Sequence, residues 1–314
     1  MKIIVSLLGR LKSFQQSFCK EYIWLCRPKL LLFILFCALV GLLLSMDNVI
    51  LWNDIWLKIV PGVTGIMLAA AGGVVYHQLM STAKSSPEKY RFPFNNQICR
   101  DDACCFSLLL CLAAVFLLAW VNYLILALVW FAFLAHAVLY SAFLKHQNSS
   151  KIMLIAVVFS LTPILGWSVV STEFNPQVWS LALVIFFWVH IYNWISSIKE
   201  KFHLSDNQQK ALHQAYTILF LKKKIFLATA MVYIMAMSPF LFNLSGEVYI
   251  LGAFILGIGF LQKAFALLLA RMEKDILKLS EILRHYALYY LPSLFSLMVV
   301  DHFLFFNPTA FVIM

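Results

Sequence analysis

Hydrophobic blocks alternate with polar segments along the whole chain. The blocks are long and continuous, and each approaches the roughly 20 apolar residues that a helix needs to cross the hydrocarbon core of a bilayer. Only helices and closed barrels satisfy the backbone inside lipid, and these blocks are too long for barrel strands. The pattern predicts nine membrane-spanning helices, at residues 30–46, 57–80, 103–121, 123–144, 152–171, 178–198, 224–243, 247–270 and 286–306.

Basic residues are confined to alternate polar segments. All but two of the 24 Lys and Arg residues, Lys58 and Lys263, lie in the N-terminal arm or in four segments between hydrophobic blocks. An excess of Lys and Arg marks cytoplasmic segments, so we expect a cytoplasmic N-terminus and, with an odd number of spans, a C-terminus on the opposite side. The chain is then a single polytopic domain, residues 1–314, with a cytoplasmic arm (1–29) and long cytoplasmic loops (81–102 and 199–223).

The second long loop has helical character. Ser205 or Asp206 could cap a helix from Asn207 through Phe220, which carries an apolar stripe. The sequence leaves two readings open, a lid over the membrane mouth or an extension of the seventh span.

Composition supports a membrane protein of the all-α class. Hydrophobic residues make up 63% of the chain and charged residues 12%, far from the balance of a soluble globule. The net charge of +10 does not indicate nucleic-acid binding, because the basic residues are divided among membrane loops instead of forming one face. The seven cysteines show no paired metal or redox spacing, so we expect them to act as small apolar residues.

One segment carries a family resemblance. Residues 140–167, YSAFLKHQNSSKIMLIAVVFSLTPILGW, resemble the link and fifth helix of the protoheme IX farnesyltransferase (heme O synthase) branch of the UbiA prenyltransferase superfamily. The positions that fit the family's spacing without a gap are Tyr140, Leu144, Lys145, Ile152, Pro163, Gly166 and Trp167.

Weaker matches follow the same order along the chain. Residues 25–29 resemble the family's Leu-x-Lys-Pro-Arg start of helix one, and Ala69–Gly73 resembles its small-residue run in helix two. Trp188 and Trp194 keep the spacing of a tryptophan pair in helix six, and Asp301-His302 matches a pair that closes helix nine. The resemblance covers nearly the whole chain and implies nine helices around a central cavity.

The resemblance implies prenyl transfer from an isoprenoid diphosphate, here the farnesylation of protoheme IX to heme O. It also implies Mg²⁺, held by two aspartate clusters at the cytoplasmic ends of helices two and six. Mg²⁺ prefers hard oxygen ligands, and carboxylates one helical turn apart can share one ion. In this chain Ser81 marks the degraded first cluster, since no acidic residue occurs between Asp54 and Glu88. Near the second cluster, Glu200 and Asp206 are the candidate catalytic and metal-binding residues.

Basic and aromatic residues supply the candidate substrate contacts. Basic side chains suit the diphosphate, although topology and anionic lipid headgroups also account for them. Histidine and its aromatic neighbours in helix six suit heme or a prenyl chain, although a packing role is the alternative for His190 and an outer-face anchor for His302. The candidates are Arg27, Lys29, Arg91, Lys145, His190, Tyr192, Asn193, Trp194 and His302.

The resulting hypothesis is a UbiA-type prenyltransferase-like protein of the heme O synthase branch, in a bacterial inner membrane. Its small molecules are an isoprenoid diphosphate and heme, the latter as substrate or ligand. The alternative is a non-catalytic paralogue that binds heme, an isoprenoid or a terminal-oxidase assembly partner, because the carboxylates are substituted. A transporter draws support from the number of spans alone.

Overall fold

The computed structural model describes residues 21–46, 55–82, 100–132, 148–173, 175–202 and 208–303. Within these residues the secondary structure is helical throughout, which confirms the all-α class. A π-helical turn, Ile55–Ile59, leads into the second long helix, and a shorter helix spans Tyr123–Ala132. The long helices are α2 (Pro28–Leu44), α4 (Val60–Thr82), α5 (Arg100–Val121), α7 (Asn148–Trp167), α8 (Pro176–Phe202), α9 (Gln208–Leu241), α10 (Glu247–Leu269) and α11 (Glu273–Asp301).

The helices support an integral membrane protein. Five segments of the described chain are long and apolar enough to cross a membrane, and Pro28–Leu44, Tyr123–Ala132 and Met153–Trp167 are shorter apolar helices. Each of the nine predicted spans overlaps a helix in the described part of the chain. The number of crossings and the sides of the termini stay predictions.

Two helices extend beyond the predicted spans. α9 begins at Gln208 and continues without a break into the seventh predicted span, so residues 208–223 form an extension of that span and not a separate lid helix. α11 begins at Glu273, ahead of the predicted start at residue 286. Both extensions are rich in Lys, Gln, Glu, Ala and Leu, which favour helix but lower the hydropathy from which the spans were predicted.

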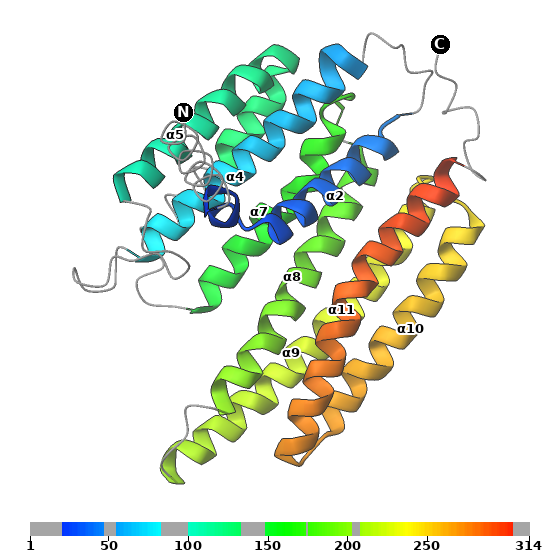
Figure 1. Ribbon diagram of the computed structural model, residues 1–314. Helices are drawn as coiled ribbons and strands as arrows, with labels where there is room; N and C mark the ends of the chain where they lie inside the picture. The colour runs from blue at the N-terminus through cyan, green and yellow to red at the C-terminus, as the bar shows by residue number, and fades with distance from the viewer. Residues whose placement is uncertain are drawn as a thin grey trace, which may run out of the picture.

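The helices form two groups that meet along α7, α8 and α2 (Figure 1). In one group, α8, α9, α10 and α11 pack in sequence, and α11 returns to contact α8. In the other, α4 pairs with α5, and α2 packs against both α7 and α4. The largest apolar core runs through α2, α7 and the α8–α11 group, and joins the two groups.

Two polar side chains link helices within the α8–α11 group by donating to backbone carbonyls. The indole nitrogen of Trp188 donates to the carbonyl of Ala287 at 2.7 Å, which links α8 to α11. The hydroxyl of Tyr249 donates to Ala236 at 2.6 Å and links α10 to α9. Such bonds matter in an apolar medium because an unpaired polar group there costs several kcal/mol.

Candidate functional site

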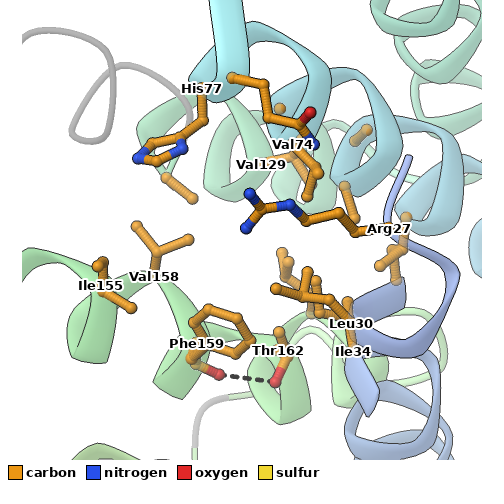
Figure 2. Close-up of a pocket in the computed structure, with 17 residues that line it drawn as sticks. Arg27, Leu30, Ile34, Val74, His77, Val129, Ile155, Val158, Phe159 and Thr162 are labelled. Atoms are coloured by element: carbon orange, nitrogen blue, oxygen red, sulfur yellow. Dashed lines mark hydrogen bonds between the residues drawn. The ribbon is translucent and has the colours of Figure 1, made fainter. Parts of the chain in front are cut away.

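An apolar cavity of about 250 Å³ lies between α2, α4, the helix Tyr123–Ala132 and α7. Most of its wall is aliphatic, with one aromatic ring from Phe159, and its polar side chains are Arg27, His77, Gln78 and Thr162 (Figure 2). The volume is near the lower end of the roughly 300–1,000 Å³ of small-molecule pockets. It therefore suits one slender apolar chain better than a chain together with a broad ring system.

Arg27 stands at one end of this cavity. Its backbone is left-handed, with φ of 51°, and the next residue, Pro28, begins α2. A proline disfavours the right-handed conformation at the residue before it. The Arg27 carbonyl accepts from the Leu30 amide at 2.9 Å, which fixes this turn at the start of the helix. With this backbone, the guanidinium reaches into the cavity on the side of His77 (Figure 2).

The last turns of α4 meet Arg27 at the same end. Gln78 is buried, and its side-chain nitrogen donates to the carbonyl of Leu25 at 2.8 Å, so α4 is tied to the turn that carries Arg27. His77 lines the cavity beside it. The sequence reasoning missed His77 because a histidine in an apolar helix is equally typical of packing. The sequence feature that could have indicated His77 is its position one helical turn before Ser81, on the same face of the helix.

The small-residue run Ala69–Gly73 is divided between two faces of α4. Ala69, Ala70 and Gly73 line the cavity, whereas Gly72 packs against α5. A Cβ placed on Gly73 would meet nothing within 4 Å, so this position opens onto free space. The small side chains of this run thus leave space for the cavity on one face of α4 and allow α5 to pack closely against the other face.

α7 forms the facing wall and is held closely against α2. A Cβ on Gly41 of α2 would overlap the backbone of Pro163, and a Cβ on Gly166 would overlap the backbone of Ala38. Backbones approach this closely only where small residues stand at the contact. Pro163 and Gly166 belong to the segment that carries the family resemblance. That segment therefore supplies a cavity wall and the contact that positions it.

The described residues do not form the expected magnesium site. Among them no group of three or more His, Cys, Asp or Glu side chains could hold a metal ion. α4 ends with Ser81 and Thr82, and α8 contributes one carboxylate position near its end, Glu200. Mg²⁺ demands near-octahedral oxygen coordination, and the described residues offer no cluster of that kind. Asp206 lies outside the described residues.

The four candidates in helix six, His190, Tyr192, Asn193 and Trp194, lie on α8, and none lines the cavity. Nδ1 of His190 is 2.8 Å from the carbonyl oxygen of Phe186, one turn earlier. The His190 and Trp194 rings pack edge to face, with centroids 5.2 Å apart. These residues share a helix but are separate from Arg27, and their role in substrate binding stays a prediction.

His302 lies at the end of α11 and is also away from the cavity. Its Nδ1 is 2.7 Å from the carbonyl oxygen of Leu244, and the ring is 3% exposed. The neighbouring Asp301 is fully buried, and its carboxylate accepts a hydrogen bond from the amide of Gly246, the residue that precedes α10. This geometry ties the end of α11 to the α9–α10 turn, and the place of His302 on the outer face of the membrane stays a prediction.

None of the other three basic candidates is placed at the cavity by the described structure. Lys29 is exposed near the start of α2 and does not line the cavity. Arg91 and Lys145 lie outside the described residues. Of the four predicted phosphate contacts, Arg27 is the one that the structure places at the cavity.

Comparison with known proteins gives a consistent result over most of the chain. The sequence profile of the UbiA prenyltransferase family matches residues 34–288. A protoheme IX farnesyltransferase of Legionella pneumophila (strain Lens) is 28% identical over 293 residues, which cover 90% of this chain and 95% of the relative. A protein of the same name from Coxiella burnetii is 29% identical over 294 residues, covering 91% of this chain and 92% of that protein.

Solved structures share the fold. A structure from a study of digeranylgeranylglyceryl phosphate synthase in membranes superposes with a TM-score of 0.68 at 16% identity, covering 90% of this chain and 98% of that one. A UbiA homologue from Archaeoglobus fulgidus, bound to DMAPP and Mg²⁺, gives a TM-score of 0.54 at 14% identity, covering 88% and 99%. With the family match over residues 34–288, these findings establish that the chain belongs to the UbiA prenyltransferase family.

Proposed function

We propose that this protein is a UbiA-type prenyltransferase-like protein of the heme O synthase branch, with farnesyl diphosphate as prenyl donor, protoheme IX as acceptor and degraded magnesium-binding motifs. The observation that carries the proposal is an apolar cavity of about 250 Å³ with Arg27 at its polar end. A prenyl chain is slender and apolar, and its diphosphate pairs well with a guanidinium. The relatives named protoheme IX farnesyltransferase support this choice of donor and acceptor.

The proposal includes nine crossings of a bacterial inner membrane, with the N-terminus in the cytoplasm. It draws support from the confinement of basic residues to alternate segments. In this orientation the start of α2 and the end of α4 share the cytoplasmic side, so the Arg27 end of the cavity faces the water-soluble head of the donor. The test is to remove the seven native cysteines, introduce single cysteines at residues 47–54 or 83–98, and label them with a membrane-impermeant reagent. Only the first set should react from outside the cytoplasm.

Product formation is the direct test of the activity. Purified protein is incubated with heme, farnesyl diphosphate and Mg²⁺, and heme O is measured by liquid chromatography and mass spectrometry. The Legionella pneumophila relative serves as the matched reference enzyme. Formation of heme O is the expected result. No product under conditions in which the reference enzyme turns over would contradict a catalytic function.

A second candidate function is binding without catalysis, as a paralogue that holds heme, an isoprenoid or an oxidase-assembly partner. The specific observation in its favour is that no Asp or Glu is among the described residues that line the cavity. Titration with heme separates the possibilities, using the wild type and His190→Ala. An absorbance change that is lost in the variant supports heme ligation at α8, whereas no change in the wild type removes heme from the candidates.

A further inference from the structure

The polar end of the cavity is positively charged. Of the polar side chains that line it, Gln78 donates to the Leu25 carbonyl at 2.8 Å, and Thr162 donates to the Phe159 carbonyl at 2.7 Å. Arg27 is different, because its guanidinium projects into the open part of the cavity (Figure 2). A guanidinium presents donors in a planar fork that matches phosphate oxygens, and it stays protonated at any physiological pH.

None of the described carboxylates near this end lines the cavity. Glu21 is half-buried in the helical turn ahead of Arg27, and Asp101 and Asp102 are exposed in the first turn of α5. Burial raises the pKa of Tyr22, and the charges of Asp102 and Glu21 add to this effect. The Tyr22 and Phe106 rings, with centroids 4.7 Å apart, hold α5 against that turn. Among the described residues that line the cavity, a divalent ion would therefore meet a cation and no carboxylate.

This charge arrangement has a consequence for the diphosphate. Mg²⁺ normally lowers the repulsion between a diphosphate and its site when carboxylates hold the ion. Here the protein offers positive charge directly, so Mg²⁺ bound to the free ligand would compete with Arg27 for the same oxygens. The left-handed backbone of Arg27 precedes Pro28 and is fixed by hydrogen bonds to its carbonyl, so the point from which the side chain enters the cavity is set before the ligand arrives.

We infer that this cavity binds a single-chain isoprenoid diphosphate without a divalent cation, with Arg27 as the direct counter-charge of the diphosphate. The inference rests on the proposed function and adds the mode of recognition. It distinguishes this chain from the Archaeoglobus fulgidus homologue, whose structure holds DMAPP together with Mg²⁺. The single slender cavity also favours one prenyl chain over a two-chain phospholipid.

Equilibrium binding tests the inference on the full-length protein in phosphatidylcholine nanodiscs. The probe is farnesyl thiolodiphosphate, a non-reactive analogue, titrated in EDTA and in millimolar Mg²⁺ by isothermal calorimetry. We expect an affinity in EDTA equal to or higher than that in Mg²⁺. Arg27→Ala should weaken binding by about tenfold or more, which corresponds to about 1.4 kcal/mol. Lys274→Ala is the matched control, because it removes an exposed positive charge at the start of α11 and should leave the affinity unchanged.

The outcomes distinguish failure of the cation-independent binding mode from failure of the proposed function. Binding that requires Mg²⁺ overturns the cation-independent mode and leaves the proposed function standing. Binding in EDTA that Arg27→Ala does not weaken also overturns the inference, because another group must then meet the diphosphate. No binding in either condition, with protein that unfolds cooperatively on heating, contradicts the proposed donor itself. Arg27→Lys guards against misfolding, since it keeps the charge but not the fork and should bind between wild type and Arg27→Ala.

Discussion

Gly166 of α7 lies directly against the backbone of Ala38 of α2, so closely that a Cβ at position 166 would overlap the Ala38 carbonyl. Ala38 is fully buried at this contact, and the same two helices form adjacent parts of the cavity wall. The contact therefore fixes how α7 is placed against α2 at one side of the cavity.

Gly166→Ala should destabilise the protein. The added methyl group forces α2 and α7 apart, and overpacking of this kind costs about 1–3 kcal/mol. The measurement is the midpoint of thermal unfolding in detergent. Gly73→Ala is the matched control, because a Cβ at Gly73 meets nothing within 4 Å. Equal midpoints for Gly166→Ala and the wild type would show that the two helices are not held at this distance.

Gly73→Leu should fill the cavity without harming the fold. The side chain enters open space on the wall of α4, and replacing a helical glycine favours the helix by about 1 kcal/mol. We expect unchanged or higher thermal stability together with at least tenfold weaker binding of farnesyl thiolodiphosphate. Full binding by this variant would place the prenyl chain somewhere else in the molecule.

The positions of the helices followed from hydropathy, but their lengths did not. Residues 208–223 and 273–285 form the first parts of α9 and α11, although their polar side chains were typical of loops. Helix propensity and contacts with neighbouring helices stabilise such segments as helix. A hydropathy pattern, which detects only apolar stretches, reflects neither of these two effects.

The candidate site was predictable only in part. Arg27 was a candidate because residues 25–29 resemble the family's start of helix one, whereas His77 and Gly73 lie in an apolar helix whose sequence does not show which face meets a cavity. That face is set by the approach of α2 and α7, which depends on contacts far apart in the sequence. His190 and Trp194 were grouped with Arg27 on chemistry, and the structure separates them because α8 faces the other helix group.

Asp301→Asn should weaken the anchor of α11 to the turn before α10. The buried carboxylate accepts from the Gly246 amide at the positive end of the α10 dipole, and hydrogen bonds to a charged group contribute about 1.5–3 kcal/mol. We expect a lower unfolding midpoint and faster proteolysis near residues 243–247. Asp275→Asn, at an exposed position in the first turn of α11, is the control and should stay within about 0.5 kcal/mol of wild type. A loss of equal size in both variants would argue against a specific role for Asp301.

Introducing aspartates at His77 and Ser81 should create a requirement for Mg²⁺. The two positions are one helical turn apart near the end of α4, so carboxylates there can share one ion, and position 77 lines the cavity beside Arg27. In EDTA, the His77→Asp, Ser81→Asp variant should bind farnesyl thiolodiphosphate at least tenfold more weakly than in Mg²⁺. The His77→Asn, Ser81→Asn variant has the same shape without the charge and should show no such difference. If Mg²⁺ changes neither variant, the end of α4 does not face the diphosphate. If heme O forms with the aspartate variant but not with the wild type, the missing carboxylates are what limits catalysis in this chain.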